Sequence, residues 1–265
     1  EMQFNFNGNP NNFKNCYLQA KLASSNFSLY GLNAQGLSLD FLLDQKIARI
    51  PALSINFYDG LIQGSGALNL DTPNLPYQLE LKAGGIKLEK LKVDTASKDK
   101  NISGTLQGEI KLSGYSDDLN KLSGWGSFKV SEGKLWELNL FQGLGKLLFA
   151  KDFIHIMFSE CTADFSVGNK FVVTDNLKLK SDIANLAGAL KIGFDSSLAG
   201  NLDVEVISEM VPLSGTLKDI TTAIVGSSGK FGVIKLSGTL QQPKYTFKTA
   251  VASLIKGLTD VLFGK

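Results

Sequence analysis

The sequence has little of what most catalytic sites use. Among 265 residues it contains one histidine, His155, and one arginine, Arg49. A single histidine excludes His-rich metal sites and makes a Ser-His-Asp triad a poor candidate. Neither a Gly-x-Ser-x-Gly elbow nor the Gly-Lys-Ser/Thr of a phosphate-binding loop is present. The sequence therefore predicts a protein that is not an enzyme and that has no cofactor or metal.

Cysteines and charges are also sparse or balanced. Cys16 and Cys161 have no metal-site spacing, and each shares its strand parity with apolar neighbours. This predicts two buried thiols, although a disulfide stays open as an alternative in an oxidising compartment. The 27 basic and 25 acidic residues are spread along the chain, so no nucleic-acid partner is expected. No apolar run approaches the roughly 18 residues that span a bilayer, and any membrane anchor is expected outside this chain.

What the sequence has in abundance is period-two alternation. From Ile102 to Gly114 every even position is aliphatic or glycine, and every odd position is polar. Successive strand residues point to opposite faces, so this segment predicts a strand about 40 Å long with one apolar face. Most strands of globular proteins are shorter, roughly 3–10 residues. Similar alternation predicts strands at Leu37–Phe41, Leu53–Phe57, Ile62–Leu70, Tyr77–Ala83, Ile86–Val93, Leu122–Val130, Ala163–Val167, Phe171–Val173, Leu177–Leu179, Leu186–Phe194, Leu198–Val206, Val233–Leu240 and Tyr245–Phe247.

Three segments have helical spacing of apolar residues instead, at Leu135–Phe149, Leu213–Val225 and Ala250–Phe263. The predicted fold is therefore mainly β, in one domain over residues 1–265. It is a large, strongly twisted and curled antiparallel sheet that forms a groove or half-barrel, with about three short amphipathic helices capping it. Asp59-Gly60 predicts a hairpin turn between two of its strands.

The apolar face of such a sheet is too large for three helices to cover. About twelve strands of about ten residues give a face on the order of 1,900 Å², and three short helices shield on the order of 600 Å². A patch of the remaining size is not tolerated on a soluble monomer. Two alternatives follow from the residues alone: the sheet fills its own interior, or it forms a trough that holds an apolar guest.

Two passages resemble the AsmA-like family, specifically its C-terminal domain. The first, Ile102–Phe149, combines a Gly-punctuated strand, a Gly-Tyr-Ser-Asp linker, a Leu-Ser-Gly-x-Gly-x-Phe strand and a Leu-rich helix. The second, Met210–Phe263, has a Val-Pro-Leu helix entry, a Lys-Leu-Ser-Gly-Thr-Leu strand and a terminal amphipathic helix. The resemblance covers residues 54–265, and residues 1–53 are expected to form N-terminal strands that match less clearly.

This resemblance implies a protein related to bridge-like lipid transfer and outer-membrane biogenesis proteins, in the periplasm or cell envelope of Gram-negative bacteria. It implies phospholipids or other acyl-chain lipids as partners and brings no catalytic residues. The side chains expected to contact acyl chains share the apolar face of the long strands: Leu106, Ile110, Leu112, Phe128, Val130, Leu190, Ile192, Phe194, Leu202 and Val204. A helix lid or membrane-surface stripe is expected at Val251, Leu254, Ile255, Leu258 and Leu262.

The alternative hypothesis is a structural or interaction module of the envelope. It has a self-filled β core and no lipid cargo, and it binds envelope proteins by pairing its sheet edge with another chain.

Overall fold

Fourteen β-strands make up about three quarters of the residues that the structure, a computed structural model, describes. The described residues are 1–9, 16–135, 157–182, 184–207 and 230–249. The strands are β1 (Met2–Asn7), β2 (Tyr17–Leu29), β3 (Leu32–Asp44), β4 (Ile47–Phe57), β5 (Gly60–Asn69), β6 (Pro76–Lys87), β7 (Ser103–Tyr115), β8 (Asp118–Lys134), β9 (Glu160–Gly168), β10 (Phe171–Lys180), β11 (Ala184–Gly193), β12 (Leu198–Val206), β13 (Lys230–Gly238) and β14 (Pro243–Thr249).

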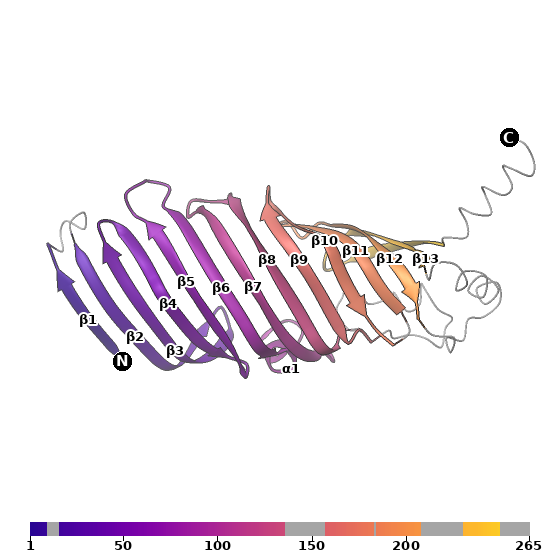
Figure 1. Cartoon of the computed structure of the whole chain (residues 1–265), viewed down its shortest axis with the longest axis horizontal. Coiled ribbons are helices and arrows are strands. Elements are labelled where there is room, and N and C mark those ends of the chain that lie inside the picture. The colour runs from indigo at the N-terminus through magenta and orange to yellow at the C-terminus, as the bar shows by residue number, and fades with distance from the viewer. Residues whose placement is uncertain (10–15, 136–156, 183, 208–229, 250–265) are drawn as a thin grey trace, which may run out of the picture.

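All fourteen strands form one antiparallel sheet in which each strand pairs with the next along the chain. The sheet is not closed, because β1 and β14 are edges and do not pair with each other. The strands lie side by side across the long axis of the molecule, and they change direction strongly towards β14 (Figure 1). The prediction of a mainly β, antiparallel fold is therefore confirmed.

The predicted strands fall inside observed ones or extend beyond their ends by at most two residues, with one exception. The chain leaves the sheet after Lys87 and forms the short helix α1 (Leu88–Leu91) and the 3-10 turn η2 (Lys92–Asp94), so the strand predicted at Ile86–Val93 is wrong. The physical reason is a break in the ladder at Gly84-Gly85, where the register shifts and Gly85 has a φ of 73°. Beyond this break Leu88 contacts the hydrophobic core.

Other predictions need smaller changes or cannot be compared. The hairpin at Asp59-Gly60 exists, but its two turn residues are Tyr58 and Asp59, and Gly60 already begins β5. N-terminal strands were expected within residues 1–53, but no bounds were predicted for β1 and β2. Apart from Leu135, the three predicted helices lie outside the described residues, and α1 is none of them.

The strand register places apolar residues from neighbouring strands in continuous rows on one face. The central row crosses the sheet perpendicular to the strands, through Leu22, Leu39, Leu53, Gly64, Leu81, Ile110, Gly126 and Phe165. The adjacent row on the other face runs through Gln63, Lys82, Glu109, Ser127 and Asp164. The apolar and polar faces inferred for one strand thus extend over most of the sheet.

Burial divides this apolar face into two halves. In the C-terminal half, side chains of β8–β13 form a single buried cluster, in which Leu179, Leu186, Leu202, Val204, Ile234 and Leu236 are almost fully covered. Tyr245 and Phe247 of the last strand pack against the same cluster. This half is a closed hydrophobic core. The apolar side chains of β2–β7 are instead mostly half-buried.

Candidate functional site

The candidate site is the half of the apolar face that the described residues leave only half-buried, which we call the open face: the apolar side of β2–β8. Its central members are Leu22, Leu39, Leu53, Leu81 and Ile110, and all five are half-buried. Among the described elements, the only helix that contacts strands of this part is α1, which touches β6 and β7. The register holds these side chains in place, because a slip of one residue would move each to the polar face.

The open face is large for a surface that the described part of the chain does not bury. Seven strands of about ten residues give about 1,100 Å² at roughly 4.8 Å between strands and 3.3 Å per residue. Contiguous apolar patches on soluble monomers are usually no larger than a few hundred Å², and larger ones mark sites that bind a partner, a ligand or a membrane. The area therefore points to an apolar occupant.

The opposite face of the same strands carries charged side chains that form ion pairs. Cross-strand ion pairs join Lys111 to Glu80 at 3.0 Å and Lys82 to Glu109 at 3.5 Å. Further along, Lys180 and Lys129 both pair with Glu160, and their hydrogen bonds lower the pKa of its carboxyl group. Exposed pairs of this kind contribute little stability, at most about 1 kcal/mol each. These ion pairs show which face of the sheet is exposed to water. The other face is unusual because its side chains are apolar and only half-buried.

The predicted acyl-chain contacts are divided between the two halves. Ile110 and Leu112 lie half-buried on the open face, and Leu106 and Phe128 lie where it meets the core. Ile192 is half-buried against the core, and Phe194 is exposed just beyond the end of β11. The remaining four, Val130, Leu190, Leu202 and Val204, are buried members of the core cluster. The predicted stripe Val251, Leu254, Ile255, Leu258 and Leu262 lies outside the described residues, as does His155.

Most of the open face was missed as a site by sequence reasoning. The predicted contacts all came from four strands with long alternation, whereas Leu22, Leu39, Leu53 and Leu81 come from β2, β3, β4 and β6. The same alternation is present in those strands and could have identified them. Nothing in the pattern distinguishes a residue that the folded protein covers from one that it leaves open.

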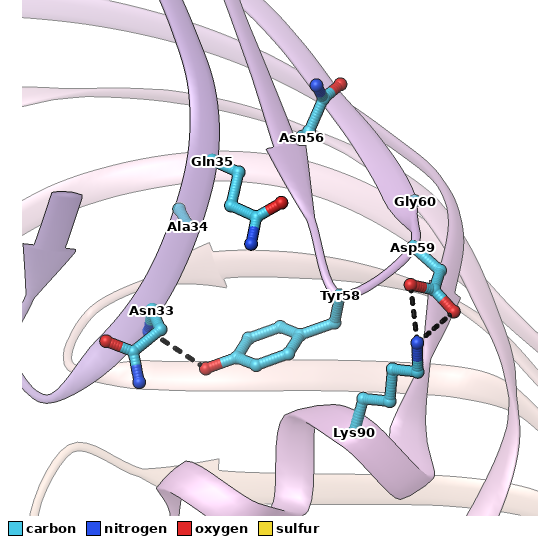
Figure 2. A pocket seen from close by; sticks show the side chains of 8 residues that line it. All are labelled: Asn33, Ala34, Gln35, Asn56, Tyr58, Asp59, Gly60 and Lys90. Carbon is cyan, nitrogen blue, oxygen red and sulfur yellow. Dashed lines mark hydrogen bonds and ion pairs between the residues drawn. The ribbon is translucent and has the colours of Figure 1, made fainter. Parts of the chain in front are cut away.

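A polar network secures one end of the open strands. The Tyr58 hydroxyl donates a hydrogen bond to the Asp94 carboxylate at 2.5 Å. It accepts one from the Asn33 backbone N–H at 3.0 Å (Figure 2). The Asn33 side-chain amide also donates to Asp94, at 2.9 Å, and Lys90 pairs with Asp59 at 2.6 Å. The hydrogen bond from Tyr58 lowers the pKa of Asp94, so this carboxylate is charged at neutral pH. These contacts tie the connection after α1 to the ends of β3 and β4.

Three hollows in the described part of the molecule lie away from the central row. One of about 390 Å³ lies beside the network in Figure 2, and one of about 550 Å³ lies near Arg49, Tyr115 and Lys121 at the other end of the strands. A third, of about 370 Å³, includes Lys82, Glu109 and Lys129 of the polar face. None of these three is lined by the five central side chains, so the central row is separate from all three hollows.

The part of the chain that the structure describes offers no arrangement for metal chemistry. Within those ranges no group of three or more His, Cys, Asp and Glu side chains could hold a metal ion. In the same ranges no helix is long and apolar enough to cross a membrane.

Both cysteines are buried thiols and do not form the disulfide left open by the sequence. Cys161 lies in the core cluster, and burial raises the pKa of its thiol from the ordinary 9.0 to about 12. A thiol is nucleophilic only as the thiolate, so Cys161 is unreactive in the folded protein at neutral pH.

This shift predicts a loss of stability at alkaline pH. Between about pH 9 and pH 12 the unfolded chain releases the Cys161 proton while the folded chain keeps it, so the free energy of unfolding falls as pH rises. Urea unfolding at a series of pH values in this window should show a shallower fall for Cys161→Ala than for the wild-type chain. Tyr245, whose pKa burial also raises to about 12, is unchanged in both proteins and supplies the common part of the slope. Equal slopes would contradict the prediction.

Comparison with known proteins identifies no relative of this chain. The chain matches no protein-family model, no curated protein and no solved structure. The resemblance to the AsmA-like family therefore stays a prediction, and functional inference rests on the open face itself.

Proposed function

We propose that this chain is a non-catalytic lipid-binding or lipid-transfer module that holds phospholipid acyl chains on its open face. The observation that carries the proposal is the central row, in which half-buried aliphatic side chains of β2, β3, β4, β6 and β7 lie in register across the sheet. An occupant that covers this row must be apolar, elongated and flexible. The acyl chain of a phospholipid has these three properties.

The dimensions and the energetics favour such an occupant. From β2 to β7 the row extends about 24 Å, at roughly 4.8 Å between neighbouring strands. Each methylene removed from water contributes about 0.8 kcal/mol, so ten or more covered methylenes offset the cost of ordering a lipid. No specific polar contact is needed along the row, and the headgroup stays in water beyond it.

The two halves of the apolar face have different roles in this proposal. The core of β8–β13 supplies the stability of the sheet, because its side chains are buried without any guest. Lipid occupies the open face only, and Leu106 and Phe128 mark where it ends. The groove or half-barrel shape and the site of action, outer-membrane biogenesis or lipid homeostasis in the Gram-negative envelope, are proposed from the resemblance to the AsmA-like family.

Placing one charge on the open face tests the proposal. Ile110→Glu should lower the amount of co-purified phospholipid about tenfold or more, because a carboxylate in the central row must lose water when an acyl chain covers it. The half-buried position lets the carboxylate remain hydrated in the empty protein, so the fold should be kept. Both chains are expressed in bacteria, and bound lipid is measured by native mass spectrometry and by organic extraction.

The matched control is Gln107→Glu, which adds the same charge to the same strand on the opposite face, beside Lys129. This variant should carry as much lipid as the wild-type chain, and circular dichroism should show the same strand content for all three proteins. The proposal would be contradicted if the wild-type protein yielded no lipid. It would also be contradicted if a folded Ile110→Glu variant kept its lipid.

A second candidate function, an interaction module, is favoured by the edge strand β1. Its Met2, Phe4 and Phe6 side chains are exposed although they continue the apolar face beyond β2. Edge strands usually carry charges, prolines or bulges that prevent pairing, and β1 has none of these within Met2–Asn7. If edge pairing is the main function, purified protein should be free of lipid and Phe4→Lys should abolish self-association or partner binding measured by analytical ultracentrifugation.

A further inference from the structure

The tip of the β2–β3 hairpin exposes more apolar surface than its turn requires. The two turn residues, Tyr30 and Gly31, have φ values of 50° and 82°, as in a two-residue hairpin turn of type I′. The Tyr30 side chain is 98% exposed, and the preceding Leu29 is 60% exposed. Two consecutive large apolar residues thus project into solvent at the end of one of the longest hairpins.

Tyr30 is an unfavourable residue for this position. Left-handed φ values favour glycine, asparagine or aspartate, and a bulky aromatic residue there is strained. Asn-Gly would be the preferred pair for the same turn. The β4–β5 turn has the same feature, since Tyr58 has a φ of 45°, but Tyr58 makes the hydrogen bonds to Asp94 and Asn33. Tyr30 makes no hydrogen bond among the described residues, so nothing inside the fold explains its presence.

The hairpin is also free of charge over an unusual length. No Lys, Arg, His, Asp or Glu occurs from Leu22 to Leu39, which includes the tip and more than half of each strand. The pair of strands β6 and β7 contrasts with it, because its polar face carries the ion pairs Lys82–Glu109 and Lys111–Glu80. A charge-free end with an exposed Leu-Tyr pair can leave water without desolvating an ion.

We propose that the tip of this hairpin docks on a phospholipid bilayer, with Leu29 and Tyr30 inserted into the interfacial region. Tyrosine favours this zone because its ring contacts acyl chains while its hydroxyl stays among headgroups. The charged Asp94 carboxylate, bound to Asn33 three residues past Tyr30, limits insertion to the tip. Its neighbour Val93 is 60% exposed and adds apolar surface beside the hairpin. The docking site is separate from the central row and does not depend on lipid binding there.

Vesicle flotation of the full chain with phosphatidylcholine vesicles tests the docking. The double variant Leu29→Ser, Tyr30→Asn should lower the partition coefficient about tenfold or more. Because this variant creates the preferred turn sequence, its hairpin should remain formed, and circular dichroism checks this. The matched control is Leu119→Ser, which removes a side chain that is 68% exposed at the β7–β8 turn, the opposite end of the strands. This control should bind vesicles like the wild-type chain.

A second measurement locates the tip directly. The variant Tyr30→Cys carries one accessible thiol, since Cys16 and Cys161 are buried, and can be labelled with an environment-sensitive fluorophore. Its emission should increase and shift to the blue when phosphatidylcholine vesicles are added, whereas the same label at Leu119→Cys should not respond. Unchanged flotation of the folded double variant, an equal loss in Leu119→Ser, or a silent label at position 30 would each overturn the docking. The flotation and fluorescence results do not depend on whether the wild-type chain carries co-purified lipid. Failure of the docking proposal can therefore be distinguished from failure of the open-face proposal.

Discussion

Leu202→Asp is expected to lower the free energy of unfolding by about 4 kcal/mol or more, enough to unfold the C-terminal half of the sheet. Leu202 is 1% exposed and lies between Gly188 of β11 and Ile234 of β13 in the register. An aspartate there loses the packing of the leucine and places an unpaired carboxylate in the core cluster. Few single substitutions combine both costs.

Urea unfolding followed by far-ultraviolet circular dichroism measures the effect. The control is Asn201→Asp, which adds the same carboxylate one residue earlier, where the side chain is exposed on the polar face. It should change the free energy of unfolding by no more than about 0.5 kcal/mol. If Leu202→Asp left the transition unchanged, the C-terminal half would not be the closed core described here. The acyl-chain site would then extend over it, as the sequence predicted.

The different positions of Leu202 and Ile110 show which part of the site could be predicted from the sequence and which part could not. Both residues belong to long alternating segments, and both were predicted to contact acyl chains. The structure places both on the same face, so the period-two pattern correctly identified which side chains share it. It could not identify which half of that face is covered. Covering depends on how strands distant in the sequence curve and pack, and alternation carries no information about curvature.

The incorrect strand and the missed strands have local causes. The strand predicted at Ile86–Val93 failed because alternation continued through a Gly-Gly bulge, beyond which Leu88 and Leu91 are spaced as in a helical turn. The bounds of strand β1 were missed although Met2, Phe4 and Phe6 alternate with polar residues, a pattern that could have identified it. Strand β2 shows the same alternation through Leu18, Ala20 and Leu22.

The glycines of the apolar face are the clearest link between sequence and shape. Gly108, Gly124 and Gly126 occupy positions where the register would otherwise place an apolar side chain. At Gly126 an added Cβ would lie 2.5 Å from the Glu109 carbonyl oxygen and 2.5 Å from the ring of Phe165. Both distances are far below a normal contact. The β7 backbone and the Phe165 ring therefore both lie close to Gly126, where only glycine fits. This position lies where the open face meets the core.

Gly126→Val should consequently lower the free energy of unfolding by about 3 kcal/mol, because backbone and aromatic ring must both move to admit the side chain. The matched control is Gly84→Val, the same substitution in β6, where an added Cβ meets nothing within 4 Å. Valine has a higher strand propensity than glycine, so the control should be neutral or slightly stabilising in the same urea experiment. Equal stability of the two variants would mean that β7, β8 and β9 are not held this closely. Destabilisation confined to Gly126→Val would instead support a sheet whose glycines set the strand approach at the boundary between the open face and the core.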